Sequence, residues 1–119
     1  KLMKGKKKFL DTAIYHFQQA AEKILKSYLV YTDTPFEKIH NLVYLVSLCS
    51  KHDKNFEQLF EHAEILTPYA TSFRYPSEQL EPEIIDVNEA KTSSKKIISF
   101  VLEIYYRNNF CERNKFVLE

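Results

Sequence analysis

A single glycine in a chain of 119 residues is the sequence feature that most limits the possible folds. The chain also contains only four prolines. Folds made of β-strands and tight turns use both residue types heavily, because their turns need a positive or a fixed φ angle. The sequence therefore favours an all-α protein. A single glycine also excludes a glycine-rich phosphate-binding loop, which needs several.

The length and the polarity of the chain indicate one soluble domain. Hydrophobic residues make up 45% of the chain and charged residues 28%, which is ordinary for a globular protein. The uncharged run from Ile39 to Ser50 is far shorter than the roughly 20 residues of a membrane span. No apolar segment follows the basic start, so no signal peptide is predicted. We expect a cytoplasmic protein with no membrane partner.

Charge is distributed unevenly along the chain. The net charge is +1, but five of the 17 basic residues lie in the first eight positions, which leaves residues 9–119 with 12 basic and 16 acidic residues. Nucleic-acid-binding domains usually have a basic body with a focused patch, and this body is acidic. The lysine-rich start is interpreted as a solubilising segment or a frayed helix start.

Neither a metal site nor a cofactor is predicted. Cys49 and Cys111 do not make a disulfide framework, which agrees with a reducing compartment. Two metal ligands on one helical face need a spacing of four residues. None of the four histidines is paired in this way: His16, His40, His52 and His62.

The first two helices are predicted from apolar periodicity and capping residues. Over residues 9–31 the apolar residues fall in one arc, with a polar stripe on the opposite side: His16, Gln19, Glu22, Lys23 and Lys26. A second helix begins at Thr34, where Pro35 and Glu37 complete a capping box, or nearer His40, and ends near Lys51.

Two further helices follow. Asp53 or Asn55 caps the third, and Pro68 stops or kinks it near Thr67. The fourth starts at the capping box of Asp86 and Glu89 and runs to about residue 107, which leaves 108–119 as an irregular C-terminal tail. Helices of this kind bury one stripe each, so we predict an antiparallel up-and-down bundle of four or five helices in one domain, residues 1–119.

Two sets of polar residues are candidates for binding. The stripe of the first helix offers two lysines, an amide and an imidazole, which suit a phosphate and a base edge, although such a face is commonly only solvated. Arg74 lies between Phe73 and Tyr75, where its guanidinium can stack or hold a phosphate. It can equally cap the carbonyls of the preceding helix.

Three motifs make the chain resemble the HEPN family (higher eukaryotes and prokaryotes nucleotide-binding). Residues 13–26 (AIYHFQQAAEKILK) look like its signature helix, and residues 40–45 (HNLVYL) are similar to its His-x-Leu-x-x-Leu helix start. Arg74-Tyr75-Pro76, shortly after Leu66-x-x-Tyr69, resembles its Arg-Tyr-Pro turn. The three motifs follow the family's order.

The resemblance implies a helical bundle that is commonly a homodimer. It also implies a setting, because many bacterial and archaeal members are encoded beside or fused to a minimal nucleotidyltransferase, and some such pairs are toxin–antitoxin systems. Members usually have another helix before the signature helix. We therefore expect this sequence to lack an N-terminal helix or an upstream domain of the natural protein.

One departure from the family bears on catalysis. HEPN ribonucleases use an Arg followed by a His after four to six residues. In this chain the first arginine is Arg74 and the last histidine is His62, so the motif does not occur. We predict no catalytic residues and no enzyme activity, and a degraded or unusual ribonuclease is the least favoured interpretation.

The function predicted from the sequence is a non-catalytic HEPN module that binds a nucleotide or RNA and acts with a nucleotidyltransferase. Lys23 and Arg74 would hold phosphate, His40 and Gln19 would donate hydrogen bonds and Tyr75 would stack, with His16 as the sixth ligand-binding residue. The alternative is a pure protein-interaction or dimerisation domain, in which the same residues are structural.

Overall fold

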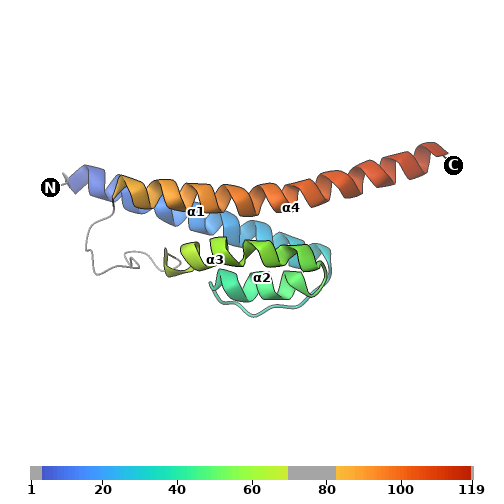
Figure 1. Cartoon of the computed structure of the whole chain (residues 1–119), viewed down its shortest axis with the longest axis horizontal. Coiled ribbons are helices and arrows are strands. Elements are labelled where there is room, and N and C mark those ends of the chain that lie inside the picture. Colours follow the sequence, from blue (N-terminus) through green and yellow to red (C-terminus); the bar gives the residue numbers. More distant parts are fainter. Residues whose placement is uncertain (1–3, 70–82, 119) are drawn as a thin grey trace.

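The computed structural model describes residues 4–69 and 83–118, and every secondary-structure element within them is a helix. The α-helices are α1 (Lys4–Tyr31), α2 (Leu42–Ser50), α3 (Phe60–Leu66) and α4 (Ile84–Leu118). Two 3₁₀ segments flank α3, namely η1 (Lys54–Leu59) and η2 (Thr67–Tyr69). Figure 1 shows the two long helices α1 and α4 side by side, with α2 and α3 as a shorter pair. The prediction of an all-α helical bundle is confirmed.

The two long helices run in the same direction. The Ser94 hydroxyl donates to the Phe17 carbonyl at 2.8 Å, and further along Ser27 and Tyr105 share a hydrogen bond of 2.9 Å. At the far end the Asn108 amide donates to the Tyr31 hydroxyl at 3.2 Å. Both helices therefore advance together, and the predicted up-and-down order does not hold for this pair. The up-and-down order fails because the connection 32–41 carries the chain back along α1 before α2 begins (Figure 1).

The start of α2 is set by Asn41. Its side chain accepts a hydrogen bond from the Tyr44 backbone N–H at 3.2 Å, which is the N-cap interaction. The later of the two predicted starts, near His40, is therefore correct, and the capping box at Thr34 is not formed. The Thr34 hydroxyl instead contacts Thr32 and His52. It lies just after the end of α1 at Tyr31, where Asp33 has a positive φ of 55°.

The remaining helix ends agree with the sequence in part. Asp53 caps η1 by accepting from the Asn55 N–H at 2.9 Å, and the helical pattern changes at Thr67 as predicted. At the start of α4, Asp86 accepts from the Glu83 N–H at 3.0 Å, so Asp86 is the third helical residue and not the cap. The predicted irregular tail is wrong, because α4 continues to Leu118. Residues 108–118 contain neither glycine nor proline to stop it.

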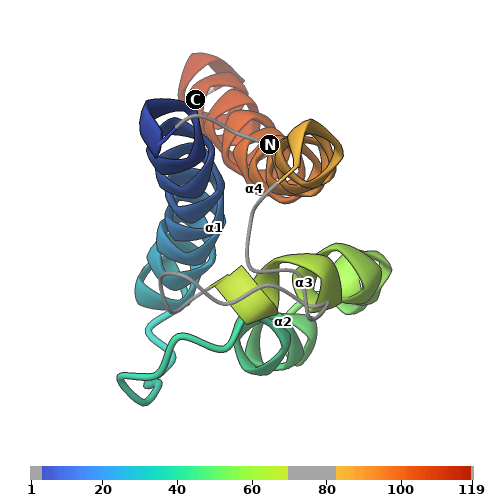
Figure 2. The ribbon, with the colours of Figure 1, turned by 90° about the vertical axis from the view of Figure 1, so that its left-hand side faces the viewer.

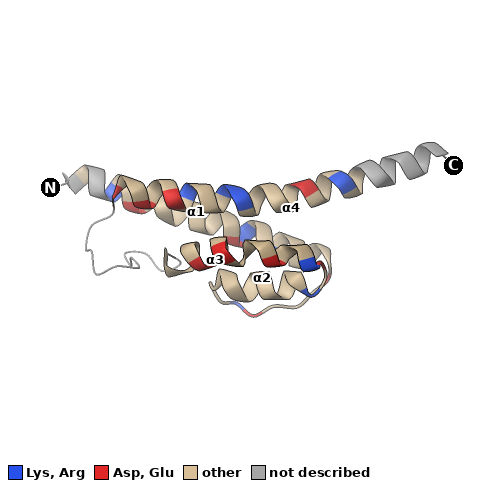
Figure 3. Cartoon of the chain, in the orientation of Figure 1, with Lys and Arg blue, Asp and Glu red and all other residues tan. Residues whose placement is uncertain are grey.

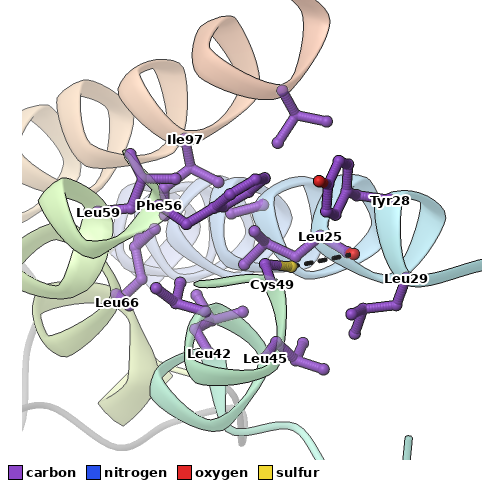
Figure 4. Close-up of a cluster of buried hydrophobic side chains, with 14 of the residues drawn as sticks. Leu25, Tyr28, Leu29, Leu42, Leu45, Cys49, Phe56, Leu59, Leu66 and Ile97 are labelled. Carbon is purple, nitrogen blue, oxygen red and sulfur yellow. Dashed lines mark hydrogen bonds between the residues drawn. The ribbon is translucent and has the colours of Figure 1, made fainter. Parts of the chain in front are cut away.

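The hydrophobic core lies where α2 and α3 cover one side of the α1–α4 pair (Figures 2 and 4). Phe56 is fully buried at its centre, with its ring centroid 4.6 Å from that of Tyr28 and 4.8 Å from that of Phe100. The Cys49 thiol is buried and lies 3.9 Å from the Leu25 carbonyl oxygen (Figure 4). Burial raises the pKa of this thiol to about 12, so it is a packing group and not a nucleophile.

Ile97→Ala tests whether this core holds α4 in place. Ile97 is fully buried, and we expect its truncation to lower the free energy of unfolding by about 2–5 kcal/mol through lost apolar contact and a cavity. The control is Ile85→Ala in the same helix, because Ile85 is 68% exposed and its loss should cost less than about 0.5 kcal/mol. Chemical denaturation measures both, and equal losses would contradict the packing described here.

Candidate functional site

Glu22 is a buried carboxylate on α1. Its side chain is only 4% exposed, although the periodicity placed it on the solvated stripe. The prediction failed because the connection 32–41 folds back over this side of α1 and brings His40 against Glu22. The His40 Nδ1 atom lies 3.0 and 3.1 Å from the two carboxylate oxygens. A residue 18 positions away thus covers a side chain that the helical pattern alone leaves in solvent.

Glu22 is the centre of a polar network on α1. The Lys26 ammonium donates to Glu22 Oε2 at 2.9 Å, and the Gln18 amide donates to Oε1 at 3.2 Å. Gln18 is fully buried and accepts in turn from the Gln19 amide at 2.8 Å. We call these five residues the Glu22 network: Gln18, Gln19, Glu22, Lys26 and His40. The buried carboxylate is therefore paired with cationic and amide donors, as a buried charge must be.

The environment of Glu22 keeps it charged. Burial raises its pKa, but hydrogen bonds from Lys26, His40 and Gln18, together with the Lys26 charge, lower it more, so the pKa lies below the ordinary value of 4.5. A carboxylate only accepts hydrogen bonds, so the contact assigns a proton to His40 Nδ1. The His40 side chain is still 59% exposed. The network therefore orients an imidazole whose other edge is available to a ligand.

Lys26 connects the network to an aromatic ring on the same connection. Its ammonium lies 5.9 Å from the ring centroid of Phe36, within the range of a cation–π contact. The ammonium thus bridges Glu22 on α1 and Phe36 on the connection. Both Lys26 and His40 fix the path of residues 32–41.

The structure brings together two of the six predicted ligand-binding residues. Gln19 and His40 both belong to the Glu22 network. His16 and Lys23 are exposed on α1 outside the network, and the His16 ring lies 6.1 Å from that of Tyr15. Arg74 and Tyr75, the other two, lie outside the described residues.

The sequence analysis missed Gln18 and Glu22 as site residues, and it included Lys26 in the candidate polar stripe but not among the six ligand-binding residues. Glu22 and Lys26 form an acid–base pair four residues apart, a spacing that predicts contact on a helix. That signal was present in the sequence. No signal in the sequence predicted the burial of Gln18, because an amide next to the apolar arc is commonly exposed.

Within the described residues, the contact between His62 and Ser93 does not make a second site. His62 Nδ1 lies 3.2 Å from the Ser93 hydroxyl, but Ser93 is 2% exposed, so no substrate reaches this hydroxyl. Across residues 4–69 and 83–118, no group of three acidic, histidine or cysteine side chains is placed to hold a metal ion. In the same ranges no helix has the length and apolarity to span a membrane.

Glu22→Gln tests the charge of the network. The variant keeps the shape but loses the charged acceptor, and we expect a loss of about 1–3 kcal/mol in the free energy of unfolding at pH 7. Because the pKa of folded Glu22 is lowered, its stabilisation is complete above the ordinary value of 4.5 and is lost as the pH falls through the lower folded pKa. The difference from the wild type should therefore shrink in acid.

Urea denaturation between pH 3 and pH 7 measures that difference. Glu61→Gln is the matched control, because Glu61 is exposed on α3 and its charge should add little stability. A loss in Glu22→Gln that stays constant down to pH 3 would show that the carboxylate charge is not what the network uses.

Comparisons with known proteins test the resemblance found in the sequence. Searches of curated proteins and of solved structures gave no match. The profile of the HEPN domain matches residues 3–105, which covers α1, α2, α3 and most of α4. That match includes the Glu22 network and both pairs of helices. The chain therefore belongs to the HEPN domain family.

Proposed function

We propose that this chain is a non-catalytic HEPN module that binds a nucleotide or an RNA segment and acts with a minimal nucleotidyltransferase. The observation that supports a ligand site is the Glu22 network. It orients an exposed imidazole, His40, and places it on the same side of α1 as Gln19.

The residues around the network have donor and acceptor groups that suit a nucleotide. His40 presents its second ring nitrogen, and Gln19 retains its carbonyl oxygen after its amide has donated to Gln18. Lys23 is exposed one turn from Gln19 and offers a mobile cation for phosphate. In the proposal, Arg74 adds a second phosphate contact, Tyr75 stacks on a base, and His16 extends the site along α1.

The proposal excludes ribonuclease action by the family's known arrangement. That arrangement needs an arginine four to six residues before a histidine, and every histidine here precedes every arginine. An oriented imidazole without this arginine is suited to binding. We place the module in the cytoplasm as a homodimer, with the nucleotidyltransferase fused or separate, in a setting of the toxin–antitoxin kind.

One observation favours the alternative of a pure protein-interaction domain. Gln18 and Glu22 are buried and their polar groups are used inside the molecule, which is how a structural network behaves. In that alternative, His40 serves only to hold the connection 32–41 on α1. Substitution of its partners then costs stability and changes no ligand affinity.

Thermal unfolding against nucleotides and short single-stranded RNAs separates the two. A ligand at a hundred times its dissociation constant adds about 2.7 kcal/mol, a rise of roughly 10 °C in Tm for a domain of this size. We expect such a rise with one class of ligand, and its loss in Lys23→Ala/Arg74→Ala. A flat panel for the folded protein supports the interaction domain.

The control for the double variant removes the same charges elsewhere. Lys54→Ala/Arg107→Ala lowers the positive charge by the same amount at two exposed positions, on η1 and α4. We expect this control variant to keep ligand binding. If both double variants lost binding, the lower net charge would explain the loss, and a specific site would not be needed. RNA cleavage that disappears in His40→Ala would overturn the non-catalytic assignment.

A further inference from the structure

The Glu22 carboxylate fixes the direction of the hydrogen bonds in its network. An ionised carboxylate accepts hydrogen bonds and donates none, so each group that contacts it must donate. The Lys26 ammonium has only protons to give, and Gln18 turns its side-chain nitrogen to Glu22 Oε1 at 3.2 Å. One charged group therefore decides the orientation of a buried amide whose two ends have nearly the same shape.

The same direction passes from Gln18 to Gln19. Because the nitrogen of the buried Gln18 amide faces Glu22, its carbonyl oxygen faces the next amide and accepts there. The Gln19 nitrogen lies 2.8 Å from that oxygen and donates to it. The half-buried Gln19 side chain therefore turns its nitrogen inward, and its carbonyl oxygen is the free end of the amide.

The carboxylate also sets the tautomer of His40. The Nδ1 atom lies 3.1 and 3.0 Å from the two carboxylate oxygens, so the proton of the neutral imidazole is on Nδ1. Nε2 then holds a lone pair on the outer edge of a side chain that is 59% exposed. The sequence analysis expected Gln19 and His40 to donate to a ligand, whereas the network presents both of them as acceptors.

We propose that this polarity makes the site selective for guanine among the nucleobases. The inference rests on the ligand binding of the proposed function and names the base. Guanine carries two adjacent donors on its Watson–Crick edge, the N1–H and the 2-amino group, and two acceptors suit that edge. Adenine and cytosine place a ring nitrogen with a lone pair beside their amino group. Uracil places a carbonyl oxygen on each side of its N3–H, so all three set an acceptor against an acceptor.

The charge beside the acceptors favours a nucleotide over an arginine side chain, which also presents adjacent N–H donors. The Lys26 ammonium offsets the charge of Glu22, and Lys23 is exposed one turn from Gln19. Figure 3 shows further acidic residues along α3, in the other pair of helices. The local positive charge repels a guanidinium group and attracts the phosphate of a guanine nucleotide.

The tautomer of His40 tests the polarity without any ligand. Proton–nitrogen correlation NMR spectra of the full chain are recorded at pH 9, where an ordinary imidazole is neutral. We expect the ring proton of His40 on Nδ1 and an unprotonated Nε2. A proton on Nε2 overturns the inference and leaves the proposed function standing.

Calorimetric titration with single nucleotides tests the choice of base. We expect guanosine monophosphate to bind about tenfold more tightly than inosine monophosphate, which lacks only the 2-amino group and so loses one hydrogen bond. The adenine, cytosine and uracil nucleotides should bind more weakly than the guanine nucleotide. Equal binding of all five, or binding of arginine amide in place of a nucleotide, overturns the inference. If neither single nucleotides nor RNA bind, the proposed function fails with it.

Glu22→Gln reverses the direction of the network. Lys26 only donates, so the carbonyl oxygen of the new amide faces Lys26 and its nitrogen faces Gln18. Gln18 and Gln19 then turn over, and Gln19 presents its nitrogen outward. We expect the tenfold preference for the guanine over the inosine nucleotide to be lost, a change that a loss of stability alone does not produce.

Glu61→Gln is the matched control, because Glu61 is exposed on α3 and its substitution should keep the preference. Gln19→Met removes one acceptor and leaves the buried carboxylate in place. It should weaken binding of the guanine nucleotide more than binding of the adenine nucleotide, which tests the inference even where Glu22→Gln does not fold. A preference that is unchanged in the folded variants overturns the inference.

Discussion

The carboxylate of Glu22 is the group on which the arrangement of this bundle depends. It receives Lys26 and Gln18 from its own helix and His40 from the connection, so it anchors residues 32–41 along α1. Because the connection returns toward the start of α1 before α2 begins, the chain has reversed direction without a helix. The helices α2 and α3 then run in opposite directions as a hairpin, and α4 runs parallel to α1. Asn41 next to His40 ends the connection and starts α2.

The helices of this fold were predictable from the sequence, but their directions were not. Apolar periodicity gave α1, and the caps at Asn41 and Asp53 are local effects of a few residues. The direction of α2 depends on a contact between residues 18 positions apart, which no local pattern encodes. The length of α4 was underestimated for a different reason, because the residues after Arg107 lack an apolar period yet contain no residue that breaks a helix.

The candidate site was predictable only where a motif marks it. Gln19 and His40 came from the resemblance to the HEPN family, and the structure joins them through Gln18 and Glu22. Periodicity placed Glu22 in solvent because a helical wheel shows only the helix itself. The burial of this residue comes from the connection. A buried polar residue beside an apolar arc therefore calls for a search for the distant segment that covers it.

The charged contacts of the buried Glu22 carboxylate are better explained by specificity than by net stability. A buried ion pair roughly offsets its own desolvation, and an apolar replacement of similar volume is often no less stable. An apolar group, however, accepts any neighbouring apolar segment, whereas a carboxylate with two open oxygens selects donors in fixed directions. Lys26 donates only to Glu22 Oε2 and Gln18 donates only to Oε1, whereas His40 contacts both oxygens. The network thus specifies one path for the connection along α1.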